Sequence, residues 1–183
     1  MIAAETEKYA KIWEHPDYGN FSPGEQFVDL FLEQASKPER RRLVDLGCGI
    51  GRASLALQNA GFEVSCVDLV DSRTDKSLPF VKGSLWTSDW WGVPYDCGYC
   101  TDVLEHIPTE YVMLTLHRIS QGCERCFFSI SNVPDHFGST IGQPLHLTVK
   151  PFVWWKQRIE ESGGNILHAR DLMTDSVFWV DYG

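Results

Sequence analysis

The sequence predicts an α/β fold with a doubly wound, mostly parallel β-sheet. Stretches with the apolar pattern of strands alternate with stretches of helical periodicity over residues 42–162, and this rhythm places parallel strands between two layers of helices. A glycine-rich turn directly follows the first strand. The last two strand-like stretches have no helix between them, so we expect a C-terminal antiparallel hairpin at the edge of the sheet.

Each expected element follows from its local pattern of apolar, turn and capping residues. The expected strands are Arg42–Leu46, Glu63–Leu69, Phe80–Leu85, Cys97–Val103, Arg125–Ser131, Asn165–Ala169 and Val177–Tyr182, and the expected helices are Arg52–Asn59, Glu110–Ile119 and Pro151–Ser162. Only residues 70–79, which are mostly polar and end in Pro79, separate the second strand from the third. We therefore expect the crossover helix after the second strand to be reduced or absent.

The first 40 residues are expected to form a helical lead-in or lid. Helical periodicity runs from Ile2 to Trp13, turn residues follow from Pro16 to Gly24, and a second helical stretch ends at Pro38. Residues 41–183 then supply the core of the sheet. A chain of 183 residues is long enough to bury roughly two thirds of its unfolded surface in one domain, so we expect residues 1–183 to form a single domain.

Composition and charge limit the function classes. Apolar residues make up 43% of the chain, as in ordinary globular proteins, and the longest uncharged apolar stretches are far shorter than the ~20 residues of a membrane helix. Glu5, Glu7 and Lys8 stand where a signal peptide has its apolar core, so we expect a cytoplasmic protein with no membrane partner. The net charge of −9 repels polyanions. The sequence has one basic cluster, formed by Lys37 and Arg40–Arg42. Because a single cluster stands against this average repulsion, we do not expect nucleic acid as a partner.

Six cysteines in a chain without a secretion signal are expected to be thiols. Cys97-x-x-Cys100 and Cys123-x-x-Cys126 also have the spacing of a tetrahedral zinc site. Cys100 and Cys126 fall within apolar strand patterns, where free cysteine behaves as a small hydrophobic residue. We therefore favour buried thiols and keep a zinc site as the alternative.

The glycine turn after the first strand is the strongest functional signal. Its glycines follow the pattern Gly47-x-Gly49-x-Gly51, at the sheet edge where ligands bind and where glycines let backbone amides approach them. A dinucleotide fingerprint has its third glycine one position later, where this chain has Arg52, which disfavours NAD and FAD. Asp68 closes the second strand, where a carboxylate accepts hydrogen bonds from both ribose hydroxyls of an adenosine.

Three segments of the chain resemble motifs of a known family. Residues 44–51, 67–69 and 101–108 read Val-Asp-Leu-Gly-Cys-Gly-Ile-Gly, Val-Asp-Leu and Thr-Asp-Val-Leu-Glu-His-Ile-Pro. They resemble successive motifs of class I S-adenosylmethionine (SAM) dependent methyltransferases, whose core is Rossmann-like. Within this class, the chain is most similar to the broad group that contains the ubiquinone-pathway O-methyltransferases and similar small-molecule enzymes. The resemblance covers residues 42–182 and implies SAM as the cofactor.

The resemblance also implies roles for individual residues. The three glycines flank the methionine part of SAM, Asp68 holds the ribose, and Asp102 lies near the amino-acid end of the cofactor. Ser84 and Leu85 match the adenine side, although such enzymes often have Asp where Ser84 stands. The full set of expected cofactor-binding residues is Asp45, Gly47, Cys48, Gly49, Gly51, Asp68, Leu69, Ser84, Leu85 and Asp102.

A second group of residues could act on the methyl acceptor. Asp102, Glu105 and His106 follow the fourth strand and His146 follows the fifth, so an imidazole there could take the acceptor's proton. The same pattern resembles the divalent-metal sites of ubiquinone-pathway O-methyltransferases and small-RNA 2′-O-methyltransferases, where a cation lowers the pKa of the acceptor hydroxyl. A helix-capping and pocket-shaping role is the third interpretation. We expect His106, Glu105 and His146 to be catalytic, and a divalent metal is an alternative that we do not expect.

The sequence thus predicts a SAM-dependent methyltransferase that acts on an oxygen or nitrogen of a small or medium-sized acceptor, either a small molecule or a glycan-like compound. The Asn/Asp-Pro-Pro-aromatic and Pro-Cys signatures of DNA methyltransferases are absent. One alternative is a SAM-binding regulatory or degenerate module without turnover. Another is an RNA-end 2′-O-methyltransferase, which would use the basic cluster at Arg40–Arg42. The sequence does not indicate an oligomeric state.

Overall fold

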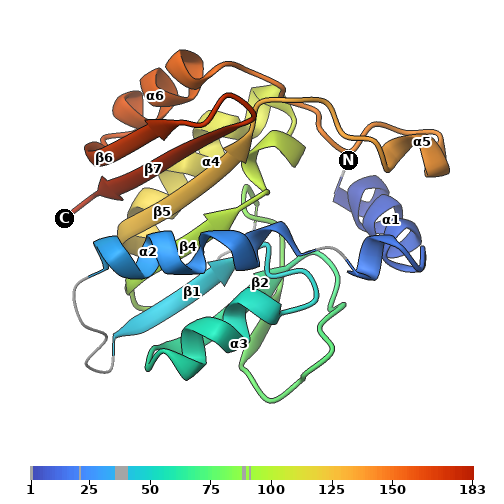
Figure 1. Ribbon diagram of the computed structural model, residues 1–183, viewed down its shortest axis with the longest axis horizontal. Helices are drawn as coiled ribbons and strands as arrows, with labels where there is room; N and C mark the ends of the chain where they lie inside the picture. The colour runs from blue at the N-terminus through green and yellow to red at the C-terminus, as the bar shows by residue number, and fades with distance from the viewer. Residues whose placement is uncertain (1, 21, 36–40, 88–89, 91) are drawn as a thin grey trace.

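A seven-stranded sheet forms the centre of the protein. The computed structural model describes residues 2–20, 22–35, 41–87, 90 and 92–183, and in this part of the chain the strand order is β3-β2-β1-β4-β5-β7-β6 (Figure 1). The strands are β1 (Arg42–Leu46), β2 (Glu63–Asp68), β3 (Phe80–Lys82), β4 (Tyr95–Thr101), β5 (Cys123–Ser131), β6 (Asn165–Asp171) and β7 (Asp175–Asp181). Strand β7 pairs antiparallel with both β5 and β6, and the other pairs are parallel. The predicted fold class is therefore confirmed.

Helices cover both faces of the sheet. The α-helices are α1 (Ile2–Trp13), α2 (Val28–Gln34), α3 (Arg52–Asn59), α4 (Thr109–Gly122), α5 (Gly138–Ile141) and α6 (Phe152–Glu161), and the 3₁₀ helices are η1 (Tyr18–Asn20), η2 (Pro23–Phe27) and η3 (Leu104–His106). Helices α2 and α3 pack on one face, and α4 and α6 pack on the other. Helices α1 and α5 contact each other beyond one end of the sheet (Figure 1).

The strands have apolar side chains on both faces because both faces are covered. In β4, Cys97 and Tyr99 join the cluster under α2 and α3, whereas Cys100 joins the cluster under α4 and α6. Phe31 of α2 and Trp155 of α6 are fully buried in these two clusters. Buried parallel strands of this kind read as continuous apolar runs, which is why the sequence pattern identified them.

The link between β2 and β3 contains no helix, as the polar segment before Pro79 predicts. Several strand bounds differ from the prediction, and two strands end two or three residues early. Strand β3 ends at Lys82 and not at Leu85, because the chain turns there and the Gly83 amide bonds the Asp68 carbonyl. Strand β4 ends at Thr101, since Asp102 adopts a left-handed backbone conformation with φ of 58°. Among the described residues, no helix combines the length and apolar character that crossing a bilayer requires.

Candidate functional site

A cavity of about 1030 Å³, counting its open mouth, lies at the carboxyl ends of β1, β2 and β4. Its described lining consists of Glu5, Tyr9, Trp13, Tyr18, Ser22, Pro23, Gly24, Asp45, Gly47, Cys48, Gly49, Ile50, Ala53, Asp68, Leu69, Gly83, Leu85, Trp86, Thr101, Asp102, Val103, His106 and Ile107. In open parallel sheets, ligands bind outside the carboxyl ends of the strands. The cavity is therefore the candidate ligand site in the described part of the chain.

The glycine turn forms the floor of the cavity. The Val67 carbonyl accepts hydrogen bonds from the amides of Gly47 (2.8 Å) and Cys48 (3.2 Å), which bends the chain sharply out of β1. Gly47 and Gly49 have φ of 77° and 52°, a region that side chains disfavour. A Cβ at Gly47 would collide with Val103, and a Cβ at Gly49 would lie 3.0 Å from the ring of Trp13. Glycine at both positions therefore permits the positive φ and the close packing of Val103 and Trp13 against the turn.

Two carboxylates hold the turn in place. Asp45 is buried, and it accepts a hydrogen bond of 2.5 Å from the Ser54 hydroxyl. Burial raises the pKa of Asp45 to about 7. Asp68 lines the cavity and accepts a hydrogen bond of 2.9 Å from the Gly49 amide, and burial raises its pKa as well. Asp68 therefore lies at the end of β2 beside the glycine turn, where an adenosine ribose is expected.

Helix α1 supplies the opposite wall of the cavity. Glu5, Tyr9 and Trp13 all line it, and their spacing of four residues places them on one face of the helix. The Tyr9 hydroxyl shares a hydrogen bond of 2.8 Å with Nδ1 of His106, and burial raises the pKa of Tyr9, so the hydroxyl keeps its proton. None of the three was predicted as a site residue. The signal that could have identified them is the Glu-Tyr-Trp face of the lead-in helix.

Four side chains meet next to this wall. The metal-ligating atoms of Asp102, Glu105, His106 and His146 all lie within 4.8 Å of one another. Nε2 of His106 is 3.9 Å from Oδ2 of Asp102, and the two imidazole rings are perpendicular with centroids 4.7 Å apart. The Nδ1–H group of His146 donates to the Val133 carbonyl over 2.6 Å. Because a carbonyl only accepts, neutral His146 has its lone pair on Nε2.

The side chains of this cluster differ in how their surroundings shift their pKa values. Glu105 is fully buried, and burial together with the neighbouring Asp102 carboxylate raises its pKa well above the ordinary value. Burial opposes ionisation of Asp102 too, but hydrogen bonding to His106 and Glu105 and the charges of the two histidines together outweigh it and lower the Asp102 pKa. Burial and the neighbouring His106 lower the pKa of His146. The cluster thus combines an ionised aspartate with a neutral imidazole.

The same set of donors suits a divalent cation. Carboxylate oxygens and imidazole nitrogens are the usual ligands of such ions, and histidine ligands are usually oriented by a hydrogen bond to the other ring nitrogen. Both histidines have that second bond, His106 to Tyr9 and His146 to Val133. In the described part of the chain, no other group of His, Cys, Asp or Glu is placed closely enough to hold a metal.

The structure brings most of the predicted site residues to one cavity. Those that line it are Asp45, Gly47, Cys48, Gly49, Asp68, Leu69, Leu85, Asp102 and His106. Gly51 and Ser84 do not line it; Ser84 is buried, and its hydroxyl accepts a hydrogen bond from the Trp86 amide. Glu105 and His146 do not line it either. Glu105 instead accepts a hydrogen bond from the Ser131 amide (2.7 Å), and its carbonyl accepts from residues 147 and 148. The roles of all these residues remain predictions.

The paired cysteines are buried free thiols and do not belong to the group that could hold a metal. In the basic cluster, Lys37 and Arg40 lie outside the described residues. Arg42 donates to the Pro94 carbonyl and lies over the Tyr95 ring, 4.7 Å from its centroid. This arginine is therefore engaged in anchoring the start of β1.

Comparisons of the sequence with known proteins point to methyltransferases. The family model described as "Methyltransferase domain" matches residues 21–174. A curated relative, the Bacillus subtilis (strain 168) protein YqeM, named as a methyltransferase, is 38% identical over 55 residues, which is 30% of this chain and only 21% of that protein. The matched stretch thus spans about a fifth of the relative.

Three solved structures share the fold. A TehB-like SAM-dependent methyltransferase from Corynebacterium glutamicum has a TM-score of 0.68 at 18% identity and covers 98% of both chains. The Burkholderia thailandensis 1,6-didemethyltoxoflavin-N1-methyltransferase, with bound substrate and S-adenosylhomocysteine, has a TM-score of 0.73 at 13% identity (98% of this chain, 88% of that chain). Magnesium protoporphyrin IX methyltransferase from Synechocystis PCC 6803, with bound SAM, has a TM-score of 0.66 at 16% identity (96% and 89%). At these identities the likeness concerns the fold.

Proposed function

We propose that this chain, which belongs to the methyltransferase domain family, transfers the methyl group of SAM to an oxygen or nitrogen of a small or medium-sized acceptor. One observation carries the proposal. The glycine turn and Asp68, which suit a nucleoside cofactor, share a single cavity with His106 and Asp102, which suit proton transfer. A cofactor held at the turn would thus have an acid–base group beside it.

The cofactor end of the cavity is the sharp turn after β1. Gly47 and Gly49 have no side chain there, and Val103 and Trp13 pack close to them. The Asp68 carboxylate lines the same cavity, where it could accept hydrogen bonds from ribose hydroxyls. When bound, SAM supplies an electrophilic methyl group on a positively charged sulfur. The solved relatives that contain SAM or S-adenosylhomocysteine support this choice of cofactor.

On the acceptor side, the chain must remove a proton from the attacking hydroxyl or amine. His106 lines the cavity and is the proposed base. Asp102, with its oxygen 3.9 Å from Nε2 of His106, would stabilise the imidazolium that forms. Glu105 bonds the Ser131 amide and the 147–148 backbone, so we assign it the positioning of His146. In a second version, Asp102, Glu105, His106 and His146 hold a divalent cation that makes the acceptor hydroxyl more acidic.

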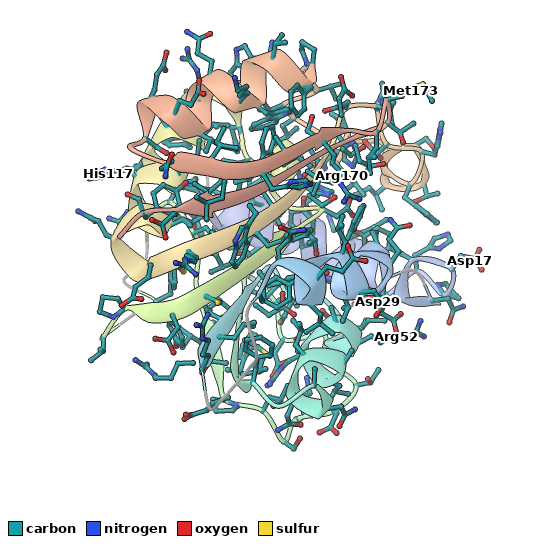
Figure 2. All side chains as sticks on the ribbon, turned by 60° about the vertical axis from the view of Figure 1, so that its left-hand side comes forward. Asp17, Asp29, Arg52, His117, Arg170 and Met173 are labelled. Atoms are coloured by element: carbon teal, nitrogen blue, oxygen red, sulfur yellow. The ribbon has the colours of Figure 1, made fainter. Side chains whose placement is uncertain are left out.

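The test is the formation of S-adenosylhomocysteine from labelled SAM in the presence of a cell extract, followed by identification of the labelled product. His106→Ala should lower turnover roughly 10²-fold while SAM affinity stays nearly unchanged. His117→Ala is the matched control, because His117 is exposed on the outer side of α4 (Figure 2). Activity that a chelator abolishes and Mg²⁺ or Mn²⁺ restores would favour the cation; chelator-resistant activity would favour the base. SAM binding without any turnover would favour a regulatory module and contradict the proposal.

A further inference from the structure

The α1 side of the cavity is lined by Glu5, Tyr9 and Trp13 from α1 and by Tyr18 from η1. Trp13 also lies against the glycine turn, because its ring is 3.0 Å from the position that a Cβ of Gly49 would take. If the cofactor lies along the turn and Asp68, these side chains border the space beside it that an acceptor can enter.

Aromatic rings dominate this side. Trp13 and Tyr18 contact edge to face with centroids 4.7 Å apart, and Tyr18 contacts Phe137 next to α5 in the same way at 5.4 Å. Tyr9 meets the His106 ring edge to face at 5.9 Å. Rings locked by their neighbours offer a rigid apolar wall, and such walls favour flat, π-rich partners.

Positive charge is missing from the lining. Among the described residues that line the cavity there is no lysine or arginine, whereas Glu5, Asp45, Asp68 and Asp102 all line it. A carboxylate or phosphate moved from water into such a site loses its hydration and gains no lysine or arginine partner from the described lining. An anionic acceptor would therefore bind poorly.

Glu5 presents the negative end of an ion pair to this space. Its carboxylate is 2.6 Å from Nζ of Lys8, whose side chain is only 3% exposed and does not line the cavity. The Lys8 ammonium also lies 5.1 Å from the centroid of the Tyr9 ring. Of this ion pair, Glu5 is a lining residue of the cavity and Lys8 is not.

From these observations we infer that the acceptor is an uncharged, planar aromatic compound and that Glu5 is the specificity residue that disfavours anionic analogues. The inference rests on the proposed function and deepens it. Recognition would come from stacking against the Trp13, Tyr18 and Tyr9 side chains, and rejection from the carboxylate end of the Glu5–Lys8 ion pair, which a carboxylated analogue would meet at Glu5.

The experiment uses the full chain saturated with S-adenosylhomocysteine. Bicyclic phenols and ring-nitrogen heterocycles are titrated as matched pairs, for example 6-hydroxy-2-naphthamide and 6-hydroxy-2-naphthoate, with the dissociation constant measured by calorimetry at pH 7.5. The uncharged members should bind at least tenfold more tightly than their carboxylated partners. Equal binding within pairs, preference for the carboxylates, or no binding by any pair overturns the inference.

A second measurement tests Glu5 itself. Glu5→Gln leaves the Lys8 ammonium without its carboxylate partner, so carboxylated members should gain about tenfold in affinity. Glu7→Gln is the matched control, since the Glu7–Lys11 pair of 2.9 Å is on the same helix and the Glu7 side chain is 70% exposed; it should change neither constant. If Glu5→Gln changes neither constant while it still binds S-adenosylhomocysteine, Glu5 does not set specificity. Should that variant not fold, the comparison of pairs on the parent protein still decides the acceptor class.

The two proposals fail separately in this design. A parent protein that does not bind S-adenosylhomocysteine contradicts the proposed function. A parent that binds it, and binds uncharged aromatic compounds selectively without ever methylating an acceptor, contradicts turnover and leaves the specificity inference standing. Methyl transfer with a preference for anionic acceptors contradicts only the inference.

Discussion

Replacing the buried carboxylate beneath the glycine turn should change how stability depends on pH. Asp45 is 3% exposed, and its side-chain hydrogen-bond partner among the described residues is the Ser54 hydroxyl at 2.5 Å. In Asp45→Asn the amide oxygen can still accept this hydrogen bond, but the side chain cannot ionise. The variant therefore separates the cost of a buried charge from the shape of the site.

The magnitude follows from the pKa of Asp45, which burial raises from 3.8 to about 7. Between about pH 4 and pH 7 the folded protein retains a proton that the unfolded chain has lost, so the stability of the parent falls as pH rises through this window. Between pH 5 and pH 8 this difference in pKa lowers the free energy of unfolding of the parent by about 2.6 kcal/mol relative to that of the variant. For a domain of this size that corresponds to roughly 5–10 °C in melting temperature.

The assay is urea unfolding of both proteins at pH 5 and pH 8, without cofactor. The Asn side chain leaves part of its amide unpaired, which lowers stability at every pH, so the measured quantity is the change in the parent–variant difference between the two pH values. Asp29→Asn, at an exposed position on α2, should show no such change. If parent and Asp45→Asn unfold with a constant difference, the carboxyl group is not held protonated in the folded protein and the reasoning is wrong.

Three further predictions concern the cavity. Asp68→Ala should weaken SAM binding roughly 10²-fold in calorimetry, because it removes the half-buried carboxylate that we propose accepts two ribose hydroxyl bonds; unchanged affinity would disprove the ribose assignment. Gly47→Ala should abolish SAM binding and should lower stability more than Gly142→Ala does. Gly142 has a similar positive φ of 69° but no atoms within 4 Å of the added Cβ. Equal losses of stability in chemical denaturation would mean that backbone strain alone matters. Tyr9→Phe should reduce turnover about fivefold to tenfold at constant SAM affinity, since His106 loses its 2.8 Å hydrogen bond; wild-type turnover would show that the bond does not orient the imidazole.

The parts of the fold that could be predicted are those that local sequence patterns specify. Strands buried on both faces give unbroken apolar runs, and the alternation of those runs with helical periodicity fixes the parallel order. The turn at Gly47 and Gly49 was predictable because positive φ demands glycine there. The missing helix before β3 was equally visible, since the link is too short and polar to pack against the sheet.

The parts that could not be predicted depend on contacts between distant segments. Tyr9 and His106 are 97 positions apart, and no local pattern in either segment indicates their hydrogen bond. The adenine-side role of Ser84 was assigned from the family resemblance, with a third strand expected to continue to Leu85. In the structure, β3 ends at Lys82 and Ser84 is buried in the turn that follows. Helix α1 read as a lead-in because its periodicity shows which residues share a face and not which cavity that face meets.

The position of Trp13 has a consequence for the timing of catalysis. Its ring carbons lie 3.0 and 3.2 Å from where a Cβ of Gly49 would stand, so the indole covers the turn at which we propose that the cofactor binds. With the cofactor there, every catalytic cycle would require α1 or the indole to move aside, and such motions often limit turnover. We expect kcat to fall as sucrose raises the viscosity of the medium, and a rapid burst of methylated product to precede the steady state.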